Sequence, residues 1–281
     1  MTQSFSPVVL LNGDFIQSEN SGWMNNRAFL YGDGFFESMR VHQGRIIHAD
    51  LHESRIRHAM ELLEFEGPDL ADFSKLEDKI NALIRKNQLS TYVRIRYTLF
   101  RQADGFYAPD NNNTGYLISA FPLEDTYTFP GQGKPAILYT RQAKARGPFS
   151  CIKSISSLFY VMAGIAVKHA GVEDCLLLNT SGNVIEALSS NVFFWYNNTL
   201  ITPPLSEGCV DGVLRRKILD LADKNGIPCR EQMIAESEVM LADEIITTNA
   251  IRGIQYFSTL NGKTYGSAKA RELHELLLAS L

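Results

Sequence analysis

The order of hydrophobic and polar positions divides the first 121 residues into short strands and two helices. Strict alternation of apolar and polar residues over 91–100 (TYVRIRYTLF) predicts a strand with one buried face. Apolar residues three and four apart predict an amphipathic helix over 49–64, and a second helix is expected over 72–87. The other expected strands are a pair around the turn Asn12-Gly13, a pair around His42-Gln43-Gly44, and residues 116–122.

A polar stretch rich in proline and glycine then interrupts the pattern. Residues 123–135 (LEDTYTFPGQGKP) have the composition of a linker. Because 281 residues suffice for two domains of ordinary size, the sequence predicts three parts. They are an N-terminal α+β domain (1–121), an interdomain linker (122–134) and a C-terminal α/β domain (135–281).

The second half mixes strands with helices, so the fold class expected for the whole chain is α/β. Its apolar runs after residue 174 are separated by turn-forming residues, which predicts a meander of hairpins. The expected elements, in order, are a strand at 136–142, a helix at about 156–170, the meander with turns at Ser181-Gly182-Asn183 and Asn197-Asn198, a helix with Asp211 near its N-cap and Gly226 beyond its end, a strand, a short acidic helix, a strand at 243–250 and a final helix.

Composition and charge narrow the class of protein. Hydrophobic residues make up 45% of the chain and charged residues 21%, as in globular proteins. A net charge of -4 leaves no basic face for nucleic acid or an acidic membrane. No apolar run reaches the roughly 18 residues of a membrane span, and the first residues lack the basic region of a signal peptide. The four scattered cysteines indicate reduced thiols in a cytoplasmic protein.

Lys153 is the only charged residue in the run 148–164 (PFSCIKSISSLFYVMAG). Its ammonium group either reaches water from a strand-to-helix junction or is partly desolvated. Desolvation lowers the pKa of a lysine, and the neutral amine is a nucleophile toward carbonyl compounds. Lys153 alone does not decide between these two interpretations.

Two turns in the second half suit a phosphate group. Gly212 opens a helix, where free N–H groups of Val213 and Leu214 and the helix dipole attract anions. Asn249 and Ala250, in the turn of TTNAIRG, add further donors. Each turn alone also has a plain interpretation, because a glycine at a helix start is commonly only a cap.

Glu186 lies among apolar and small residues in VIEALSSNVFFW. It is either a solvated carboxylate on an edge strand or a buried one that faces a ring nitrogen. A lysine that forms a Schiff base, a phosphate cradle and a carboxylate for a pyridine nitrogen together describe a site for pyridoxal 5′-phosphate.

Six ordered motifs cover nearly the whole chain: YGDGFFESMRV (31–41), LHESRIRHA (51–59), CIKSISSL (151–158), VIEALSSNVF (184–193), VDGVLRR (210–216) and TTNAIRG (247–253). With them the chain resembles the class IV, fold-type IV pyridoxal-phosphate enzymes. That family includes branched-chain aminotransferases, D-amino acid aminotransferases and aminodeoxychorismate lyases. The resemblance implies two α/β domains with the cofactor in the cleft between them, and a homodimer in which the neighbouring subunit contributes to the site.

The resemblance also implies roles for single residues. Lys153 looks like the Schiff-base lysine that carries the proton at the substrate Cα, and Glu186 looks like the partner of the pyridine nitrogen. Arg55 resembles the arginine that holds the cofactor phosphate. The phosphate-binding turns are matched by Val213, Leu214, Asn249 and Ala250.

Two positions separate the branches of this family. Leu158 stands where branched-chain enzymes have a tyrosine, five residues after the lysine. Ser38 keeps the hydroxyl that the lyases have in this motif, where the D-amino acid enzymes tend to be aliphatic. The chain is therefore most similar to the aminodeoxychorismate lyases, which implies release of pyruvate and 4-aminobenzoate, for folate synthesis. The alternative is a class IV aminotransferase of D-amino acid or branched-chain type.

The residues that contact the substrate are less defined. Arg94 and Arg96 share one face of a strand, and Arg94 aligns with a carboxylate-binding arginine of the branched-chain enzymes. Both are substrate-binding candidates, together with Tyr31, although a solvated face with cross-strand partners also explains the two arginines. Asp104 replaces the arginine of a loop that the lyases have, which weakens the case for an anionic substrate there.

A cofactor-binding protein without catalysis is a further alternative, but the presence of both Lys153 and Glu186 argues against it. Another alternative is a metal-binding module or a hydrolase. His48 and His52 are four residues apart, and Glu53 and His58 are nearby. His48 is expected to precede the helix, however, and the chain has no HExxH motif. The sequence therefore predicts no metal site.

Overall fold

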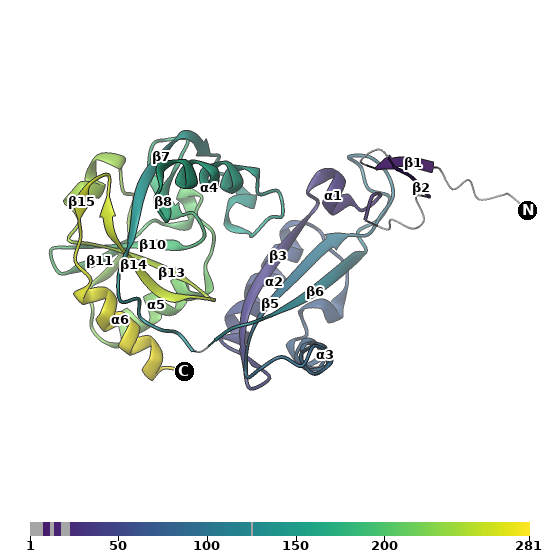
Figure 1. Cartoon of the computed structure of the whole chain (residues 1–281), viewed down its shortest axis with the longest axis horizontal. Coiled ribbons are helices and arrows are strands. Elements are labelled where there is room, and N and C mark those ends of the chain that lie inside the picture. Colours follow the sequence, from purple (N-terminus) through teal and green to yellow (C-terminus); the bar gives the residue numbers. More distant parts are fainter. Residues whose placement is uncertain (1–7, 12–13, 18–22, 125) are drawn as a thin grey trace, which may run out of the picture.

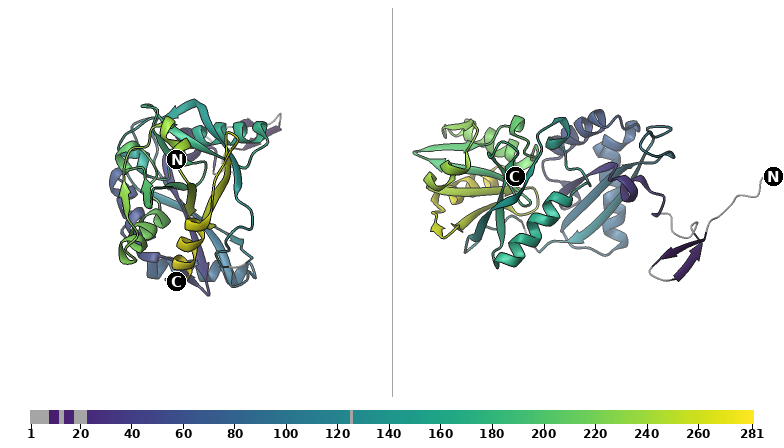
Figure 2. Two further views of the ribbon diagram at one scale, coloured as in Figure 1. Left: turned by 90° about the vertical axis from the view of Figure 1, so that its left-hand side faces the viewer. Right: turned by 90° about the horizontal axis from the view of Figure 1, so that it is seen from above.

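A computed structural model describes residues 8–11, 14–17, 23–124 and 126–281. Most of them form two lobes side by side, each built on its own sheet (Figure 1). Strands β1 (Val8–Leu11) and β2 (Asp14–Gln17) pair as a separate antiparallel hairpin away from both sheets (Figure 2). These two strands confirm the predicted pair, whereas its turn at Asn12-Gly13 lies outside the described residues.

The N-terminal lobe contains a four-stranded sheet of order β4-β3-β5-β6. Its strands are antiparallel neighbours. They confirm the predictions from the sequence, and their bounds are β3 Gly34–His42, β4 Arg45–Ile46, β5 Tyr92–Arg101 and β6 Thr114–Pro122. The two predicted helices are also present, as α2 (Ala49–Leu62) and α3 (Phe73–Lys86).

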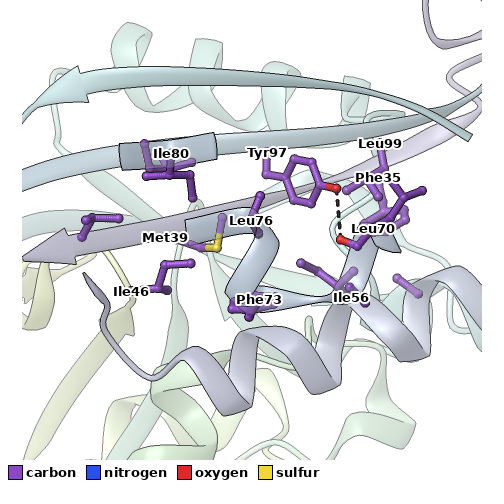
Figure 3. Packing of buried hydrophobic residues seen from close by; sticks show 14 of the residues in the cluster. Phe35, Met39, Ile46, Ile56, Leu70, Phe73, Leu76, Ile80, Tyr97 and Leu99 are labelled. Carbon is purple, nitrogen blue, oxygen red and sulfur yellow. Dashed lines mark hydrogen bonds between the residues drawn. The ribbon is translucent and has the colours of Figure 1, made fainter. Parts of the chain in front are cut away.

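Strand β5 shows why this sheet has two different faces. Its residues alternate between intermediate and buried along the whole strand. Val93, Ile95, Tyr97 and Leu99 pack with residues of α2 and α3 in one core. Figure 3 shows Tyr97 and Leu99 in this core. Arg94 and Arg96 therefore lie on the opposite face, which is the face toward the cavity described below.

The sheet of the C-terminal lobe has the order β12-β11-β10-β13-β14-β7-β8-β9, with β15 paired to β14. The strands are β7 Lys134–Lys144, β8 Asp174–Asn179, β9 Val184–Ala187, β10 Asn191–Tyr196, β11 Thr199–Thr202, β12 Cys229–Glu231, β13 Glu244–Asn249, β14 Gly253–Leu260 and β15 Lys263–Thr264.

The predicted meander of hairpins is present only in part. Hairpins β8–β9 and β10–β11 both form, but β13, β14 and β7 separate them in the sheet. Strand β14, which the sequence analysis missed, pairs with both β13 and β7 and so joins the two halves of the sheet. Non-local pairing of this kind leaves no local signal in the sequence.

Three main helices cover this sheet. Helix α4 (Leu158–Ala170) begins two residues later than predicted, α5 (Val213–Lys224) has Gly212 as its N-cap, and α6 (Ala268–Ala279) is the expected final helix. Short helices α1 (Arg27–Tyr31), η2 (Pro68–Ala71), η3 (Pro148–Cys151), η4 (Leu205–Glu207) and η5 (Glu236–Leu241) complete the fold. The expected acidic helix is η5.

The segment between β6 and β7 corresponds to the expected linker. It is not uniformly exposed, because the Tyr127 side chain is only 2% exposed and packs in the core of the C-terminal lobe. The domain boundaries expected from the sequence stay a prediction. Among the described residues, no helix is both long enough and apolar enough to cross a membrane.

The core of the N-terminal lobe contains one polar contact that can be tested. The Tyr97 hydroxyl donates to the Leu70 carbonyl at 3.0 Å, and the Tyr97 side chain is buried (Figure 3). We expect Tyr97→Phe to lower the free energy of unfolding by about 1 kcal/mol, because a buried carbonyl loses its donor. Urea unfolding measures the difference. Tyr107→Phe, at an exposed tyrosine, is the control, and equal losses in both variants would contradict the prediction.

Candidate active site

A cavity of about 610 Å³ lies between the two lobes. The face of the N-terminal sheet that points away from its core forms one wall, through β3 and β5. The other wall comes from the C-terminal lobe: residues 149–150 and 152–157, the end of β9, the start of α5 and the turn after β13. Residues far apart in the sequence therefore meet only when the two lobes are in contact.

Lys153 lies at the junction between the lobes. Its carbonyl accepts the Phe36 N–H at 2.9 Å, and the Ile155 N–H donates to the Gly34 carbonyl at 3.1 Å. These bonds attach the lysine segment to the first residues of β3. The Nζ atom lies 4.7 Å from the centre of the Phe36 ring, inside the cavity lining.

The surroundings of Lys153 change its protonation. Loss of water around the ammonium group, together with the nearby Arg55 guanidinium, lowers the pKa of Lys153 to about 8. The carboxylates Glu37 and Glu186 oppose this shift only in part. Of the two interpretations left open by the sequence, the structure favours the desolvated lysine.

Glu186 is a buried, firmly held carboxylate in β9. One oxygen accepts the Tyr160 hydroxyl at 2.6 Å and the Lys144 ammonium at 2.9 Å, and the other accepts the Val210 N–H at 2.9 Å. Burial and the charge of Glu186 raise the pKa of Tyr160, so its hydroxyl stays a donor. Neither Lys144 nor Tyr160 was predicted from the sequence to belong to the site. Tyr160 stands two residues after Leu158, but nothing in the sequence marks Lys144 at the end of a strand.

The start of α5 has the features of an anion site. Gly212 is the N-cap and has no side chain, so no capping side chain accepts hydrogen bonds from the first N–H groups of the helix. A Cβ atom at residue 212 would lie 1.7 Å from Asn191 Oδ1, so only glycine fits beside this amide. Val213, Leu214, Asn249 and Ala250 all line the cavity here. Thr248 also lines it, and its buried hydroxyl has no hydrogen-bond partner among the described residues.

Arg55 reaches this region from α2 and is fixed on two sides. Its Nε donates to Glu37 Oε2 at 3.0 Å and its Nη2 to Glu37 Oε1, while Nη1 donates to the Asp211 carbonyl at 2.9 Å. His52 Nδ1 contacts the same carboxylate at 2.6 Å. Burial opposes ionisation, yet Arg55 and His52 lower the pKa of Glu37 to about 2. Glu37 therefore stays charged and holds the guanidinium in place.

These groups fit pyridoxal 5′-phosphate. The cavity combines a desolvated amine, a carboxylate with acceptor capacity left, an unpartnered hydroxyl, and a helix start that admits no Cβ. The structure brings Lys153, Glu186, Arg55 and the two turns into one lining. Their individual roles stay predictions.

Ser38 and the substrate candidates Arg94 and Arg96 line the cavity, whereas the candidate Tyr31 does not. Ser38 pairs with Arg96 across β3 and β5, and both line the cavity with Arg94. Burial and the charge of Arg94 lower the pKa of Arg96, whose guanidinium lies 3.8 Å from the Phe36 ring centre. Arg252, in the turn after β13, also lines the cavity and was missed by the sequence analysis, because an exposed turn arginine carries no distinguishing pattern.

Tyr31 does not line this cavity within the single chain. It ends α1, where its ring lies 5.5 Å from the Tyr107 ring and 4.9 Å from the Arg27 guanidinium. Leu158 is 71% exposed and also lies outside the lining.

The histidines of the metal interpretation do not gather around a common point. His48 precedes α2 as its N-cap, and His52 is buried against Glu37. Within the described ranges, no three histidine, cysteine or acidic residues are arranged to hold a metal ion.

The chain is similar to known proteins both in sequence and in structure. A sequence model described as amino-transferase class IV matches residues 34–259. D-alanine aminotransferase of Bacillus licheniformis is 28% identical over 92% of this chain and 90% of its own length. Aminodeoxychorismate lyase of Bacillus subtilis is 26% identical over 96% and 92%. The branched-chain amino acid aminotransferase structure from Escherichia coli superposes with a TM-score of 0.82 at 22% identity, covering 98% of this chain and 94% of that one.

The lowered pKa of Lys153 has a direct consequence. A depressed pKa leaves the amine neutral at lower pH, so its rate of modification by an amine-reactive ester should rise with a midpoint near pH 8. Mass spectrometry of cofactor-free protein across about pH 6–11 measures the rate at each lysine. Exposed Lys86 is the internal reference, and identical pH profiles for Lys86 and Lys153 would rule the prediction out.

Proposed function

The chain belongs to the class IV aminotransferase family, and on that premise we propose that it is a lyase acting on 4-amino-4-deoxychorismate. The protein is an enzyme whose cofactor is pyridoxal phosphate. The proposed reaction converts the substrate into pyruvate and 4-aminobenzoate. The 4-aminobenzoate is the product that a cell uses for folate synthesis. One observation carries the choice of substrate: the excess of positive charge in the cavity.

Within the part of the chain that the structure describes, six cationic side chains and one carboxylate, Glu186, line the cavity. Lys144 is paired with Glu186, and Arg55 with Glu37. Among the described residues, Arg94, Arg96 and Arg252 pair with no carboxylate. Unpaired guanidinium groups in a partly desolvated site favour an anionic ligand, to which they donate charge-assisted hydrogen bonds. The proposed substrate carries two carboxylates, whereas an aliphatic amino acid carries one.

The cofactor would be held at both ends by residues of this chain. Its phosphate would lie between Arg55 and the N–H groups of Val213, Leu214 and Ala250, and its ring nitrogen would face Glu186. When bound, pyridoxal phosphate supplies a carbonyl carbon that combines with amines and a ring that accepts electrons from the neighbouring carbon.

The proposed reaction requires two proton movements by protein groups. Lys153, neutral above about pH 8, removes the proton from the ring carbon that bears the substrate amine. The enolpyruvyl group then leaves as its C–O bond breaks, and it gains one proton to become pyruvate. Ser38 is the proposed donor, or relay, of that proton. One proton leaves the substrate and one is returned, so no oxo acid is consumed.

A class IV aminotransferase is the second candidate. The relative with 28% identity is named D-alanine aminotransferase, and the arrangement of Lys153, Glu186 and the anion site serves both reactions. In that case Lys153 would move the proton to a second carbon, and a 2-oxo acid would collect the amino group. The three unpaired arginines favour the lyase.

Product analysis distinguishes the two candidates. We expect the cofactor-loaded protein to release pyruvate and equimolar 4-aminobenzoate from 4-amino-4-deoxychorismate without an added oxo acid.

Arg96→Gln should raise KM by about tenfold or more, because a charged hydrogen bond to a substrate carboxylate is lost. Ser38→Ala should lower kcat by about 10²-fold, as expected for loss of a proton donor.

Arg141→Gln, at an exposed arginine outside the cavity lining, is the control and should leave both constants unchanged. Absence of pyruvate from loaded protein that transfers amino groups to a 2-oxo acid would reject the lyase in favour of the aminotransferase.

We also propose that the protein is a cytoplasmic homodimer, with α4 in the interface. Four apolar side chains at helical spacing on α4 are exposed: Leu158, Val161, Met162 and Ile165. Phe29 and Leu30 of α1 are exposed as well. A second copy of the chain is the proposed partner, because the family resemblance implies a neighbouring subunit at the site and Tyr31 does not reach the cavity of its own chain.

Charge on the exposed face of α4 should prevent this association. We expect the native chain to sediment with twice the mass of one chain, and the double variant Val161→Lys, Ile165→Lys to sediment as a monomer, because two charges would be buried in the interface. Leu241→Lys, at an exposed leucine outside α1 and α4, should remain dimeric. A monomeric native protein would contradict the proposal.

A further inference from the structure

The turn after β13 is held in one shape by Asn249, the last residue of that strand. Asn249 Oδ1 accepts the N–H groups of Ile251 at 3.0 Å and Arg252 at 2.8 Å. The Asn249 amide donates in turn to Ser190 Oγ at 2.9 Å. Antiparallel pairing of Asn249 with Gly253 closes the turn, and Gly253 has a φ of +74°.

The Ala250 and Ile251 carbonyl groups of this turn are bound by side chains from other segments. Tyr127, in the segment between β6 and β7, donates its hydroxyl to the Ala250 carbonyl at 2.9 Å. Arg40, in β3, donates Nη2 and Nε to the Ile251 carbonyl at 2.7 and 3.2 Å. In Figure 1 the tip of the β13–β14 hairpin lies on the side of the C-terminal lobe that faces the N-terminal sheet.

Arg40 and Tyr127 also hold one another. The Arg40 guanidinium lies 4.7 Å from the centre of the Tyr127 ring, and both side chains are at least 95% buried. The same ring packs on Gly253, where a Cβ atom would lie 2.9 Å from it. Arg40 and Tyr127 together therefore contact Ala250, Ile251 and Gly253.

The contacts fix both peptide planes of the turn. A trans peptide group directs its carbonyl and its N–H in opposite directions. The plane between Ala250 and Ile251 is bound by Tyr127 at one end and Asn249 at the other, and the next plane by Arg40 and Asn249. The remaining backbone donor of the turn is the Ala250 N–H, which has no acceptor among the described residues.

We propose that Arg40 and Tyr127 are positioning residues that hold the turn in the shape that binds the cofactor phosphate. The proposal rests on the assignment of the phosphate to this turn and the start of α5. Neither side chain is in the cavity lining, so each acts through the turn. Phosphate affinity thus depends on the N-terminal sheet and on the segment that joins the lobes.

The test uses two probes that differ only in the phosphate: pyridoxine 5′-phosphate and pyridoxine. Neither has an aldehyde, so neither forms a bond with Lys153. Calorimetric titration of cofactor-free protein gives both dissociation constants. Tyr127→Phe removes one hydroxyl and should raise the constant for pyridoxine 5′-phosphate about fivefold to tenfold, with no change for pyridoxine. Arg40→Lys keeps the charge, loses the two-pronged contact, and should act in the same way.

Tyr97→Phe is the matched control. Tyr97 and Tyr127 are both 2% exposed, and each donates its hydroxyl to a backbone carbonyl. Both variants should lose similar stability, but only Tyr127→Phe should lose phosphate affinity. Equal affinities in these two variants overturn the proposal, as does a loss in Tyr127→Phe that is the same for both probes.

Gly212→Ala tests separately whether the phosphate binds at the start of α5 and the turn after β13. The new Cβ would displace Asn191 at the start of α5, so the constant for pyridoxine 5′-phosphate should rise by tenfold or more. Unchanged affinity in Gly212→Ala means that the phosphate binds elsewhere, which overturns the assignment and the proposal together. A loss in Gly212→Ala without one in Tyr127→Phe leaves the assignment standing and rejects only the positioning role. An enzyme that binds the phosphate probe normally but releases no pyruvate would instead contradict the lyase.

Discussion

The confinement of like charges in one cavity is the constraint on which the rest of this structure depends. Among the residues that the structure describes, six cationic side chains share the lining with one carboxylate. Mutual repulsion and loss of water make such a cluster costly unless partners offset it. Burial, and after it the charge of neighbouring Arg55, lowers the pKa of Lys153 to about 8, which gives the site a neutral amine at a pH where exposed lysines are charged.

The protein offsets part of this charge from outside the lining. Glu37 lies behind Arg55 and stays ionised because Arg55 and His52 surround it. Lys144 pairs with Glu186, a carboxylate of the cavity lining. The remaining guanidinium groups have no such partner among the described residues, so the unbalanced charge falls on the side expected to receive substrate.

The same arrangement gives the contact between the lobes a function. Arg55 donates to the Asp211 carbonyl, Arg40 to the Ile251 carbonyl, and the Phe36 N–H to the Lys153 carbonyl. Each bond joins the N-terminal lobe to a C-terminal segment that lines the cavity. A change in the packing of the two lobes therefore alters the anion site and the lysine together. This explains why residues outside the lining are expected to affect binding.

The sequence by itself determined the local elements of the N-terminal sheet and its helices, because alternation and helical spacing are set by near neighbours. It also determined the main chemical groups, since Lys153, Glu186 and Gly212 stand in recognisable motifs. Tertiary structure decided what depends on distant contacts: the place of β14 between β13 and β7, and the partners Lys144 and Tyr127. No local pattern specifies which remote carbonyl or carboxylate a side chain will meet, because that choice is made only when the two sheets pack.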